Sequence, residues 1–386
     1  MRILSFGLFF LTFFLLYGGL HVYFFRKLKR AFHPEGTRKI LVVAALVLLF
    51  LASPIIRVTE RVGLEAVAKF FSWGGYGWMG FLFLFFAASL LLDLWALLLR
   101  TAGKIGKRDL SSAVPAPPWA FAGPLLIAGV LSLYSFYEAR HVVVERIAIR
   151  SSKIAEQVGR VRIAQISDVH IGLLIGKERM QVLIEEIRRE SPDILVSTGD
   201  LVDGQLDGME GVAEQFKAFQ PRFGKYAITG NHEFYAGIEQ AVDFTKSAGF
   251  TVLRGDGMTI AGVLNVVGVD DDTGRNFDNY RPANERELLA KLPRRYFTLL
   301  LKHKPFIDKE AVEFFDLQLS GHTHRGQIFP FSLVTRFFFP LHAGYFRFLN
   351  ASHLYVSRGT GTWGPPMRLL SPPEVTIIDL LPAQRP

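Results

Sequence analysis

Residues 161–170 read Val-Arg-Ile-Ala-Gln-Ile-Ser-Asp-Val-His, an apolar and β-branched run that ends in Asp168-Val169-His170. The run has the composition of a buried strand, and the Asp-x-His triplet stands where this strand opens onto a loop. Taken alone the triplet is weak evidence, because short motifs match by chance and turns after strands favour Asp. Whether the triplet belongs to a functional site depends on which other polar motifs the chain contains.

Four further polar stretches each stand near the end of an apolar run. They are Gly199-Asp200, residues 230–233 (Gly-Asn-His-Glu), His303, and residues 321–324 (Gly-His-Thr-His). With residues 168–170 they hold two Asp, one Asn and five His, which is half of the ten histidines in the chain. Asp, Asn and His supply oxygen and imidazole ligands, which suit Mn, Fe, Zn or Mg. The five stretches therefore predict a site for two divalent metal ions.

One Asp shared by both cations matters most for the chemistry. Its carboxylate oxygens can bridge ions about 3.5–4 Å apart, so that a water held between them loses a proton near neutral pH and attacks phosphorus. The cations also neutralise charge that develops on the phosphoryl oxygens. We therefore expect in-line hydrolysis of a phosphomonoester, phosphodiester or pyrophosphate.

The composition indicates that part of the chain lies in lipid. Of the 386 residues 50% are hydrophobic and 35 are Phe, which is too apolar for a purely soluble protein. The net charge of +9 comes from basic residues that crowd short loops between apolar stretches. It therefore favours a membrane lipid bilayer as partner, and no nucleic acid is expected. The sequence has no cysteine, which excludes disulfides and thiolate metal sites.

Four apolar stretches are expected to cross the membrane as helices. Residues 3–25 hold about 20 apolar positions, enough for a hydrocarbon core of about 30 Å. The basic run 26–30 that follows suits a retained anchor rather than a cleaved signal peptide. The other expected spans are 40–56, 73–99 and 119–137. We expect an all-α transmembrane region of four helices over residues 1–140 and a separate domain over residues 141–386.

The basic loops predict the orientation of these spans. Lys and Arg number six in residues 26–39, four in 100–118 and three in 57–72. Short loops rich in Lys and Arg stay in the cytoplasm, so four spans put the second domain outside the cytoplasm of a plasma (inner) membrane. Asp93, in the third span, is interpreted as locally solvated or paired with Arg100 rather than as a site.

Beyond Glu138 the pattern changes to alternating strands and amphipathic helices. Residues 177–190 carry apolar positions at helical spacing and are followed by an apolar run at 193–197, which predicts a β-α-β unit. Later strands are expected at 258–260, 263–269, 296–303, 317–320, 354–357 and 374–380. Mixed elements with a strand-rich second half predict an α/β fold in which two mixed β-sheets pack face to face with helices outside.

These residues resemble the calcineurin-like metallophosphoesterase family, whose pattern is D-x-H, G-D-x-x-D, G-N-H-[DE], a lone His and G-H-x-H. The match covers roughly Val161 to the carboxyl terminus, and the order and spacing of all five blocks are hard to obtain by chance. The chain looks most like the bacterial membrane-associated branch, and it is also similar to transmembrane proteins that bear this domain. The stretches that carry this closer likeness are 167–170, 302–305, 320–324, 357–359 and 372–374. The resemblance implies the four-layer sandwich of the family.

The resemblance also implies a role for each site residue. One metal would be held by Asp168, His170, Asp200 and His324, and the second by Asp200, Asn231, His303 and His322. His232 would be no ligand but would stabilise or protonate the leaving oxygen. Asp203 would hydrogen-bond His232 and raise its basicity; the other interpretation of Asp203 is a turn residue before Gly204.

Two arginines are candidates for contact with a substrate phosphate. Arg325 stands where the membrane-associated branch commonly has Gly, and a cation there would either contact phosphate or face water. Arg358 is the second candidate; it and Arg368 stand near the chain's last strands, where most arginines lie on the surface. Glu233 and Lys304 are interpreted as supporting residues. The acidic run 270–272 lacks the ligand spacing of a calcium loop and is expected to be a polar loop.

Aromatic residues with interspersed Arg follow the last two histidines, in residues 328–331, 336–341 and 345–349. They suit contact with a lipid headgroup layer, so a lipid-linked substrate is expected; the alternative is that half of them fill the core of the second sheet. Two other functions stay open. One is a lipid-nucleotide pyrophosphatase resembling UDP-diacylglucosamine hydrolases, whose cytoplasmic substrate the expected topology disfavours. The other is a non-catalytic envelope scaffold with a structural metal site.

Overall fold

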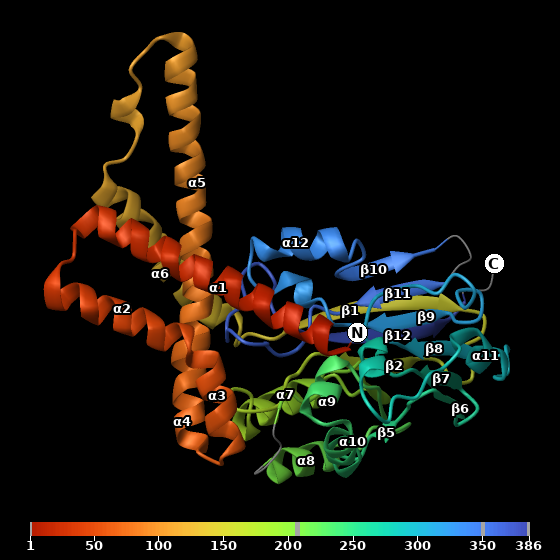
Figure 1. Ribbon diagram of the computed structural model, residues 1–386. Coiled ribbons are helices and arrows are strands. Elements are labelled where there is room, and N and C mark those ends of the chain that lie inside the picture. Colours follow the sequence, from red (N-terminus) through yellow and green to blue (C-terminus); the bar gives the residue numbers. More distant parts are fainter. Residues whose placement is uncertain (1, 205–208, 349–351, 384–386) are drawn as a thin grey trace. The chain divides into compact units, whose positions relative to one another are not determined.

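The computed structural model describes residues 2–204, 209–348 and 352–383 (Figure 1), without the side chains of residues 2–6, 8–10 and 210. Some of the positions named in the sequence analysis lie outside the described residues. They are residue 1 at the start of the first expected domain, residues 384–386 at the end of the second, and Leu349 of the aromatic stretch. The chain divides into two compact units. The first is Met1–Tyr137 with Gly364–Met367, and the second is Glu138–Trp363 with Arg368–Pro386. The domain boundary expected between residues 140 and 141 stays a prediction.

The first unit is helical. In chain order its elements are α1 (Arg2–Phe32), α2 (Gly36–Phe50), α3 (Ala52–Arg61), α4 (Glu65–Phe71), the π-helical turn η1 (Ser72–Tyr76), α5 (Gly77–Gly106), the 3₁₀ turn η2 (Ser111–Ala113) and α6 (Pro117–Glu138). Among the described residues, two helical stretches are long and apolar enough to cross a membrane, Glu65–Gly106 and Ser111–Glu138. They contain the expected spans 73–99 and 119–137.

The second expected span, 40–56, is not one straight helix. It runs across the junction of α2 and α3, where the axis bends by 51°, and the pair counts as a third span only if both helices are taken together. Pro54 explains the bend, because in a continuous helix its ring would clash with the carbonyl group of Phe50. The first expected span, 3–25, lies within α1, part of whose side chains are not described.

Asp93 on α5 pairs across to α1 rather than along its own helix. Its Oδ1 lies 2.5 Å from Nζ of Lys27, and its Oδ2 accepts a hydrogen bond of 2.6 Å from the hydroxyl of Tyr23. Arg100, the partner expected from the sequence, is seven residues further along α5, which is about 10 Å of helix rise. The packing of α1 beside α5 therefore decides the partner of this carboxylate.

The second unit contains two six-stranded sheets (Figure 1). The first has the order β1 (Val143–Ser151), β12 (Glu374–Pro382), β2 (Val161–Ile166), β3 (Ile194–Ser197), β4 (Lys225–Ala227) and β5 (Thr251–Val252). The second has the order β10 (Gly344–Arg347), β11 (His353–Val356), β9 (Leu317–Ser320), β8 (Phe297–Leu301), β7 (Leu264–Gly268) and β6 (Asp256–Ile260). Both sheets are mixed, because β12 runs antiparallel to β2, and β6 and β10 run antiparallel to β7 and β11.

Helices and 3₁₀ turns connect and cover the strands. They are α7 (Lys177–Arg189), α8 (Glu210–Lys217), α9 (Asn231–Ala236), α10 (Ile238–Ser247), η3 (Asp272–Asn276), α11 (Glu285–Ala290), η4 (His324–Gly326) and α12 (Phe331–Phe338). Alternation along each strand divides the core. Ile163 of β2 packs between the sheets with Leu299 of β8, whereas the neighbouring Ala164 packs outward with Ile184 of α7 and Phe244 of α10. This arrangement confirms the expected α/β fold of two sheets flanked by helices.

Several elements were not among those expected, and β1, β10 and α12 are three of them. β1 pairs in parallel with β12 at the edge of the first sheet, β10 extends the second sheet, and α12 is a helix within the aromatic stretch. β10 lies at the edge of its sheet and has no fully buried residue, because its residues alternate between half-buried and exposed. Its sequence therefore lacks the apolar run by which a buried strand is recognised. The expected strand 296–303 ends at Leu301, which leaves His303 in a loop.

Candidate active site

The site residues stand in loops that leave the carboxyl ends of parallel strands. Asp168 follows β2, Asp200 follows β3, and Asn231 begins α9 after β4, and these three strands are parallel neighbours. In the second sheet, His303 follows β8 and His322 follows the parallel strand β9. Because parallel strands end at the same edge of a sheet, the loops bring these side chains together on a rigid support.

The backbone is left-handed at five of these positions, although none of them is glycine. Asp168, His170, Asp200, His322 and His324 have φ between 47° and 71°, and they are five of the thirteen such non-glycine residues in the described chain. Backbone in this region is uncommon for side chains with a Cβ and persists only where the surrounding structure enforces it. The loops thus hold their polar side chains in orientations that a relaxed loop would not favour.

Two motif glycines allow the loops to touch. A side chain at Gly230 would collide with the carboxylate of Asp200, and one at Gly321 would collide with the side chains of Ser167 and Asp168. The Gly in Gly-Asn-His-Glu and the Gly in Gly-His-Thr-His are therefore required by close approach of one loop to another.

The first group of possible ligands consists of Asp168, His170 and His324, all buried. Nε2 of His324 lies 3.1 Å from Nε2 of His170 and 3.4 Å from Oδ1 of Asp168. All three ligand atoms lie within 4.8 Å of one another. The atoms therefore converge on a common point, as ligands of one cation do.

The second group consists of Asp200, His303 and His322, with Asn231 beside it. Nε2 of His303 lies 3.2 Å from Oδ2 of Asp200 and 3.2 Å from Nδ1 of His322. The amide oxygen of Asn231 lies 3.2 Å from the same His303 nitrogen. Nδ1 of His303 lies 2.8 Å from the carbonyl oxygen of Thr198, which orients the ring so that Nε2 points into the site.

Asp200 belongs to two of the possible ligand groups, the second one just described and a third with His170 and His232. Its carboxylate therefore lies between His170 of the first group and His303 of the second. It is the residue whose placement fits a carboxylate shared by two cations. The geometry also brings His232 into ligand distance, so its expected role as a non-ligand stays a prediction.

The chemistry of the donor set fits divalent cations. Burial, together with the nearby positive charge of His303, lowers the pKa of His322 to about 3, and burial beside Arg368 holds the pKa of His324 well below its ordinary value. Both imidazoles are therefore neutral, which is the form that binds a metal. Asp168 is fully buried, and burial raises its pKa. A bound cation would offset the cost of burying such a charge.

His232, like His303, has a pKa raised above the ordinary value of an imidazole. It is buried, and its Nδ1 lies 2.8 Å from Oδ1 of Asp203. Burial alone would lower its pKa, but the charges of Asp200 and Asp203 outweigh burial and raise the pKa to about 9. The ring is therefore protonated near neutral pH, as a proton donor to a leaving oxygen must be. Asp203, three residues after Asp200, is thus close to the ring of His232, as the resemblance to the family implied.

Glu233 joins the two loops that carry Asp200 and Asn231. Its Oε2 accepts hydrogen bonds of 2.7 Å from the backbone of Gly230 and 3.0 Å from that of Asp200, and its Oε1 accepts one of 2.7 Å from that of Leu201. The carboxylate is buried and satisfies donors on both sides. The expectation that Glu233 supports the site therefore has a specific physical basis.

The two candidate phosphate-binding arginines differ in their surroundings. Arg358 forms ion pairs of 2.6 Å with both Glu145 and Glu374, so its charge is already compensated within the second unit. Arg325 is exposed, directly follows His324 and has a left-handed φ of 51°. Arg325 is therefore the better placed of the two for a substrate.

Arg368, for which the sequence favoured a surface position, is fully buried. Its guanidinium donates to the carbonyl oxygens of Gly361, at 2.6 Å, and Arg358, at 2.7 Å, and lies 3.0 Å from Nδ1 of His324. It thus ties the last strand's loop to a possible metal ligand. The apolar neighbours of Arg368 in residues 364–370 are the sequence signal that could have indicated its burial.

Three aromatic rings line the histidines, and the sequence analysis did not single them out for this. Tyr235 and Trp363 each lie edge to face with His232, with ring centroids 5.4 Å apart. On the other side, Phe339 lies edge to face with His322 at 5.3 Å. About half of the surface of Tyr235 and Trp363 is exposed, so these rings are available to a substrate.

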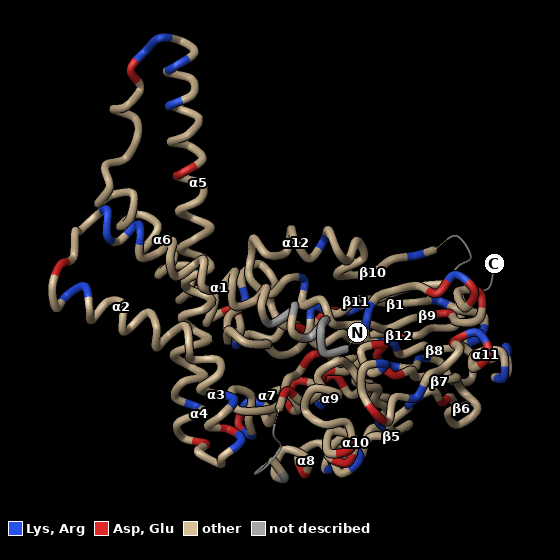
Figure 2. The backbone as a smooth tube through the Cα atoms, viewed as in Figure 1, with Lys and Arg blue, Asp and Glu red and all other residues tan. Residues whose placement is uncertain are grey.

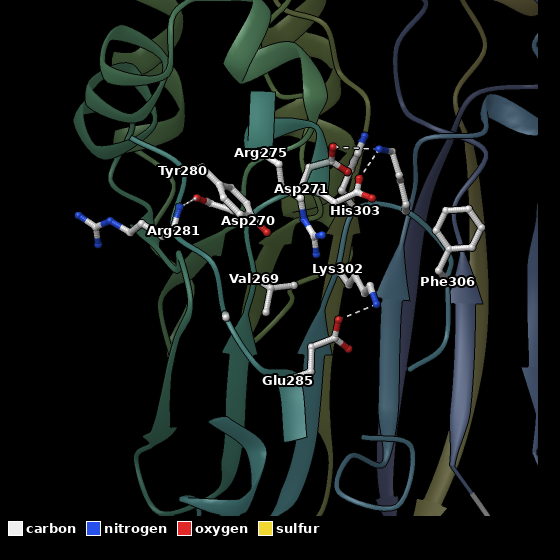
Figure 3. Close-up of a pocket in the computed structure, with 13 residues that line it drawn as sticks. Val269, Asp270, Asp271, Arg275, Tyr280, Arg281, Glu285, Lys302, His303 and Phe306 are labelled. Atoms are coloured by element: carbon white, nitrogen blue, oxygen red, sulfur yellow. Dashed lines mark hydrogen bonds and ion pairs between the residues drawn. The ribbon is translucent and has the colours of Figure 1, made fainter. Parts of the chain in front are cut away.

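A separate cavity of about 180 Å³ adjoins His303 (Figure 3). Two of its cations form ion pairs within the cavity: Lys302 lies 2.6 Å from Glu285, and Lys304 lies 3.1 Å from Asp271 and also contacts Asp272. Asp270 of the same acidic run pairs with Arg254 at 2.8 Å. The run 270–272 thus compensates nearby cations, in keeping with a polar loop rather than a calcium site.

Fold and site together define a metal-dependent phosphoesterase: two packed sheets carry, at one edge, buried Asp, Asn and His side chains that converge on shared points. Residues 161–326 match the model of the calcineurin-like phosphoesterase family. The chain is 38% identical over 257 residues to a metallophosphoesterase of Aquifex aeolicus, an alignment that covers 66% of this chain and 98% of that protein.

Two further similarities are to proteins of Danio rerio. A transmembrane protein with metallophosphoesterase domain from Danio rerio is 30% identical over 269 residues, which is 66% of this chain and 61% of that protein. Among solved structures, a dimetal phosphatase from Danio rerio is 12% identical over 52% of this chain and 87% of that chain, with a TM-score of 0.33. The chain belongs to the calcineurin-like phosphoesterase family, and the family and the ligand groups indicate divalent metal binding.

Proposed function

We propose that this protein is a membrane-anchored phosphoesterase that uses two divalent cations to hydrolyse a phosphomonoester, phosphodiester or pyrophosphate, with water attacking in line. The observation that carries the proposal is the position of Asp200. Its carboxylate lies within ligand distance of His170 on one side and of His303 and His322 on the other. The nitrogen and oxygen ligands suit Mn, Fe, Zn or Mg. When bound, two such cations would acidify a water and neutralise charge on the phosphoryl oxygens.

The protein's own groups supply the remaining steps. His232 carries a proton near neutral pH and would transfer it to the leaving oxygen as the bond to phosphorus breaks. Asp203 holds the ring of His232 and stabilises its positive charge. Arg325, exposed beside His324, would contact a phosphate oxygen of the substrate.

The substrate is proposed to be lipid-linked. The rings of Tyr235 and Trp363 flank the proton donor His232, and Phe339 flanks His322. An apolar or aromatic leaving group would contact such rings, whereas a strongly hydrated one would gain little from them. These contacts support a leaving group with an extensive apolar part.

The proposal extends to a multi-pass protein of the plasma (inner) membrane with its catalytic unit outside the cytoplasm. Two apolar helices of sufficient length and relatives named as transmembrane proteins support membrane association. The basic loops at 26–39 and 100–118 support the orientation.

The test is hydrolysis by the purified full-length protein of a panel of membrane lipids, lipid-linked nucleotides and soluble phosphate esters, with products identified by mass spectrometry. The Asp200→Asn variant serves as the matched control. We expect release of a phosphorylated headgroup or of phosphate from a lipid, by the native protein alone. Cleavage only of a lipid-linked nucleotide would select the pyrophosphatase alternative. Metal binding without hydrolysis of any substrate would contradict the proposal and leave a scaffold with a structural metal site.

A further inference from the structure

The helix α12 (Phe331–Phe338) presents its apolar side chains to solvent. Among its eight residues only Thr335 is buried. The exposed fractions are 50% for Phe331, 63% for Leu333, 45% for Val334, 81% for Phe337 and 64% for Phe338. So many large apolar side chains on one short helix form a patch that soluble surfaces avoid. The expectation that half of the rings in this stretch fill the second sheet's core does not hold for the rings of α12.

The contacts of α12 show why its apolar side faces outward. A side chain at Gly326 would collide with the backbone of Ser332 and approach the hydroxyl of Thr335, so the small polar residues of α12 lie against the Gly326 turn. Thr335 also donates a hydrogen bond of 3.3 Å to the carbonyl oxygen of Phe331. The helix is thus attached through its polar side, which reverses the usual amphipathic arrangement.

The chain around α12 is free of acidic residues. No Asp or Glu occurs between Leu317 and Pro373, whereas five arginines do, at positions 325, 336, 347, 358 and 368. Arg358 and Arg368 are used inside the unit, as described above, but Arg325, Arg336 and Arg347 are exposed and form no ion pair with a described residue. Figure 2 shows the same pattern, with basic but no acidic positions along α12 and β10.

We propose that α12 docks on the surface of an anionic lipid bilayer. Its apolar side chains would enter the boundary between headgroups and acyl chains, while Arg325, Arg336 and Arg347 contact lipid phosphates. A protein partner would have to offer both an apolar groove and unpaired acids, whereas an anionic bilayer offers both features at once. The proposal rests on the proposed membrane association of the chain and is independent of hydrolysis.

Docking of α12 would also bring the site to its substrate. Phe339, the residue after α12, lies edge to face with His322 at 5.3 Å and stacks on Phe306 at 5.3 Å. The patch and a possible metal ligand are therefore joined by one ring. A bilayer at α12 would present phosphorylated headgroups beside the metal-binding groups.

The absence of cysteine makes the first experiment specific, because one introduced cysteine is the only labelling site. Phe337→Cys and, as control, Val182→Cys would be labelled with an environment-sensitive dye in the full chain. Val182 is 64% exposed but lies on α7 among charged residues. The labelled proteins would be reconstituted in vesicles of phosphatidylcholine alone or mixed with phosphatidylglycerol, and quenched by lipids that carry a spin label on the acyl chain.

We expect the dye at position 337 to be quenched severalfold more than the dye at position 182, with the larger effect in phosphatidylglycerol. Equal quenching at both positions would overturn the proposal. Quenching at 337 that is the same in both lipids would overturn the role of the arginines. A signal that depends on protein concentration instead of lipid would assign the patch to a second copy of this chain. Repeating the experiment in the Asp200→Asn background separates docking from hydrolysis, because docking should persist there.

A second experiment uses activity without any label. Phe337→Ser with Phe338→Ser should lower hydrolysis of a lipid substrate in vesicles severalfold and leave hydrolysis of a small soluble aryl phosphodiester unchanged. Phe339 is left intact because it contacts His322. The matched control is Val182→Ser, which removes an exposed apolar side chain from α7 rather than from α12. Equal loss on both substrates would show that the two rings act on the site and not on lipid.

Discussion

The Oδ1 atom of Asp203 lies 2.8 Å from Nδ1 of His232, while the same oxygen lies 3.6 Å from Nδ1 of His170. One carboxylate thus faces both the proposed proton donor and a possible metal ligand. Burial alone would raise the pKa of Asp203, but its contacts with the two imidazoles hold the pKa far below the ordinary range. Asp203 is therefore charged at any pH at which the enzyme would work, and it stabilises the protonated ring of His232.

This contact predicts the pH dependence of the Asp203→Asn variant. The raised pKa of His232, about 9, means that the ring keeps its proton until the pH rises through that value. Loss of the Asp203 charge should lower the pKa, so the alkaline limb of kcat/KM should move to lower pH by about 1 unit. Bound cations would lower the limb in both proteins, so the comparison is made at equal metal loading. A substrate with a very good leaving group, which needs no proton, is the control; a limb that moves to higher pH would contradict the role of Asp203.

Asp200→Asn should abolish hydrolysis while the protein still inserts and folds. The amide keeps the size of the side chain and can still accept the hydrogen bond from the backbone of His232, which is 2.8 Å in the native chain. It loses the negative charge shared between the two ligand groups, so at least one cation should be released. Metal content per chain, measured beside kinetics and circular dichroism, tests this. A variant that retains two ions and full activity would remove Asp200 from its assigned place.

His232→Ala should behave differently from Asp200→Asn. As a proton donor and not a ligand, His232 should be dispensable for metal binding, and its loss should lower the rate by about 10²-fold or more. The loss should be smaller for a substrate whose leaving group needs no proton. Because geometry places His232 within ligand distance of His170 and Asp200, metal counting decides the point. Fewer ions in the His232→Ala protein would make His232 a ligand.

Glu233→Ala should destabilise the catalytic unit. Four buried backbone N–H groups would lose the acceptor that now satisfies them, those of Gly230, Asp200, Leu201 and Val202. Each unsatisfied buried donor costs about 1–3 kcal/mol, and partial relaxation reduces the sum, so a loss of about 3 kcal/mol is expected. Thermal unfolding measured in detergent checks this. Glu185→Ala, at a half-exposed helix position, is the control and should change stability by less than about 0.5 kcal/mol.

The bend between α2 and α3 determines on which side of the membrane the catalytic unit is expected to lie. If both helices together cross the membrane, a reporter active only outside the cytoplasm should be active after Pro386 and silent in the loop 26–39. If the 51° bend instead returns the chain to its starting side, the number of crossings changes by one. The catalytic unit would then lie in the cytoplasm, and the reporter after Pro386 would be silent. That outcome would favour the lipid-nucleotide alternative.

Much of the fold and of the candidate site follows from local sequence. The β-α-β pattern from residue 161 to 197 appears in β2, α7 and β3 nearly at the expected bounds, because apolar periodicity is a property of neighbouring residues. The motif residues Asp168, Asp200, His303 and His322 could likewise be chosen from the sequence. The fold alone does not require Asp and His at the ends of successive strands in this order, so their presence there indicates a functional site.

Only the tertiary structure decided which distant groups meet. Lys27, rather than Arg100, is the partner of Asp93 because α1 and α5 pack together. Arg368 is buried because the last loop folds over His324. The outward direction of α12 depends on the close approach of Ser332 to Gly326. The sequence determines which side chains each element carries and with what spacing, because both are properties of neighbouring residues. Which face of an element is covered depends on contacts between segments far apart in the sequence, and those contacts exist only in the folded chain.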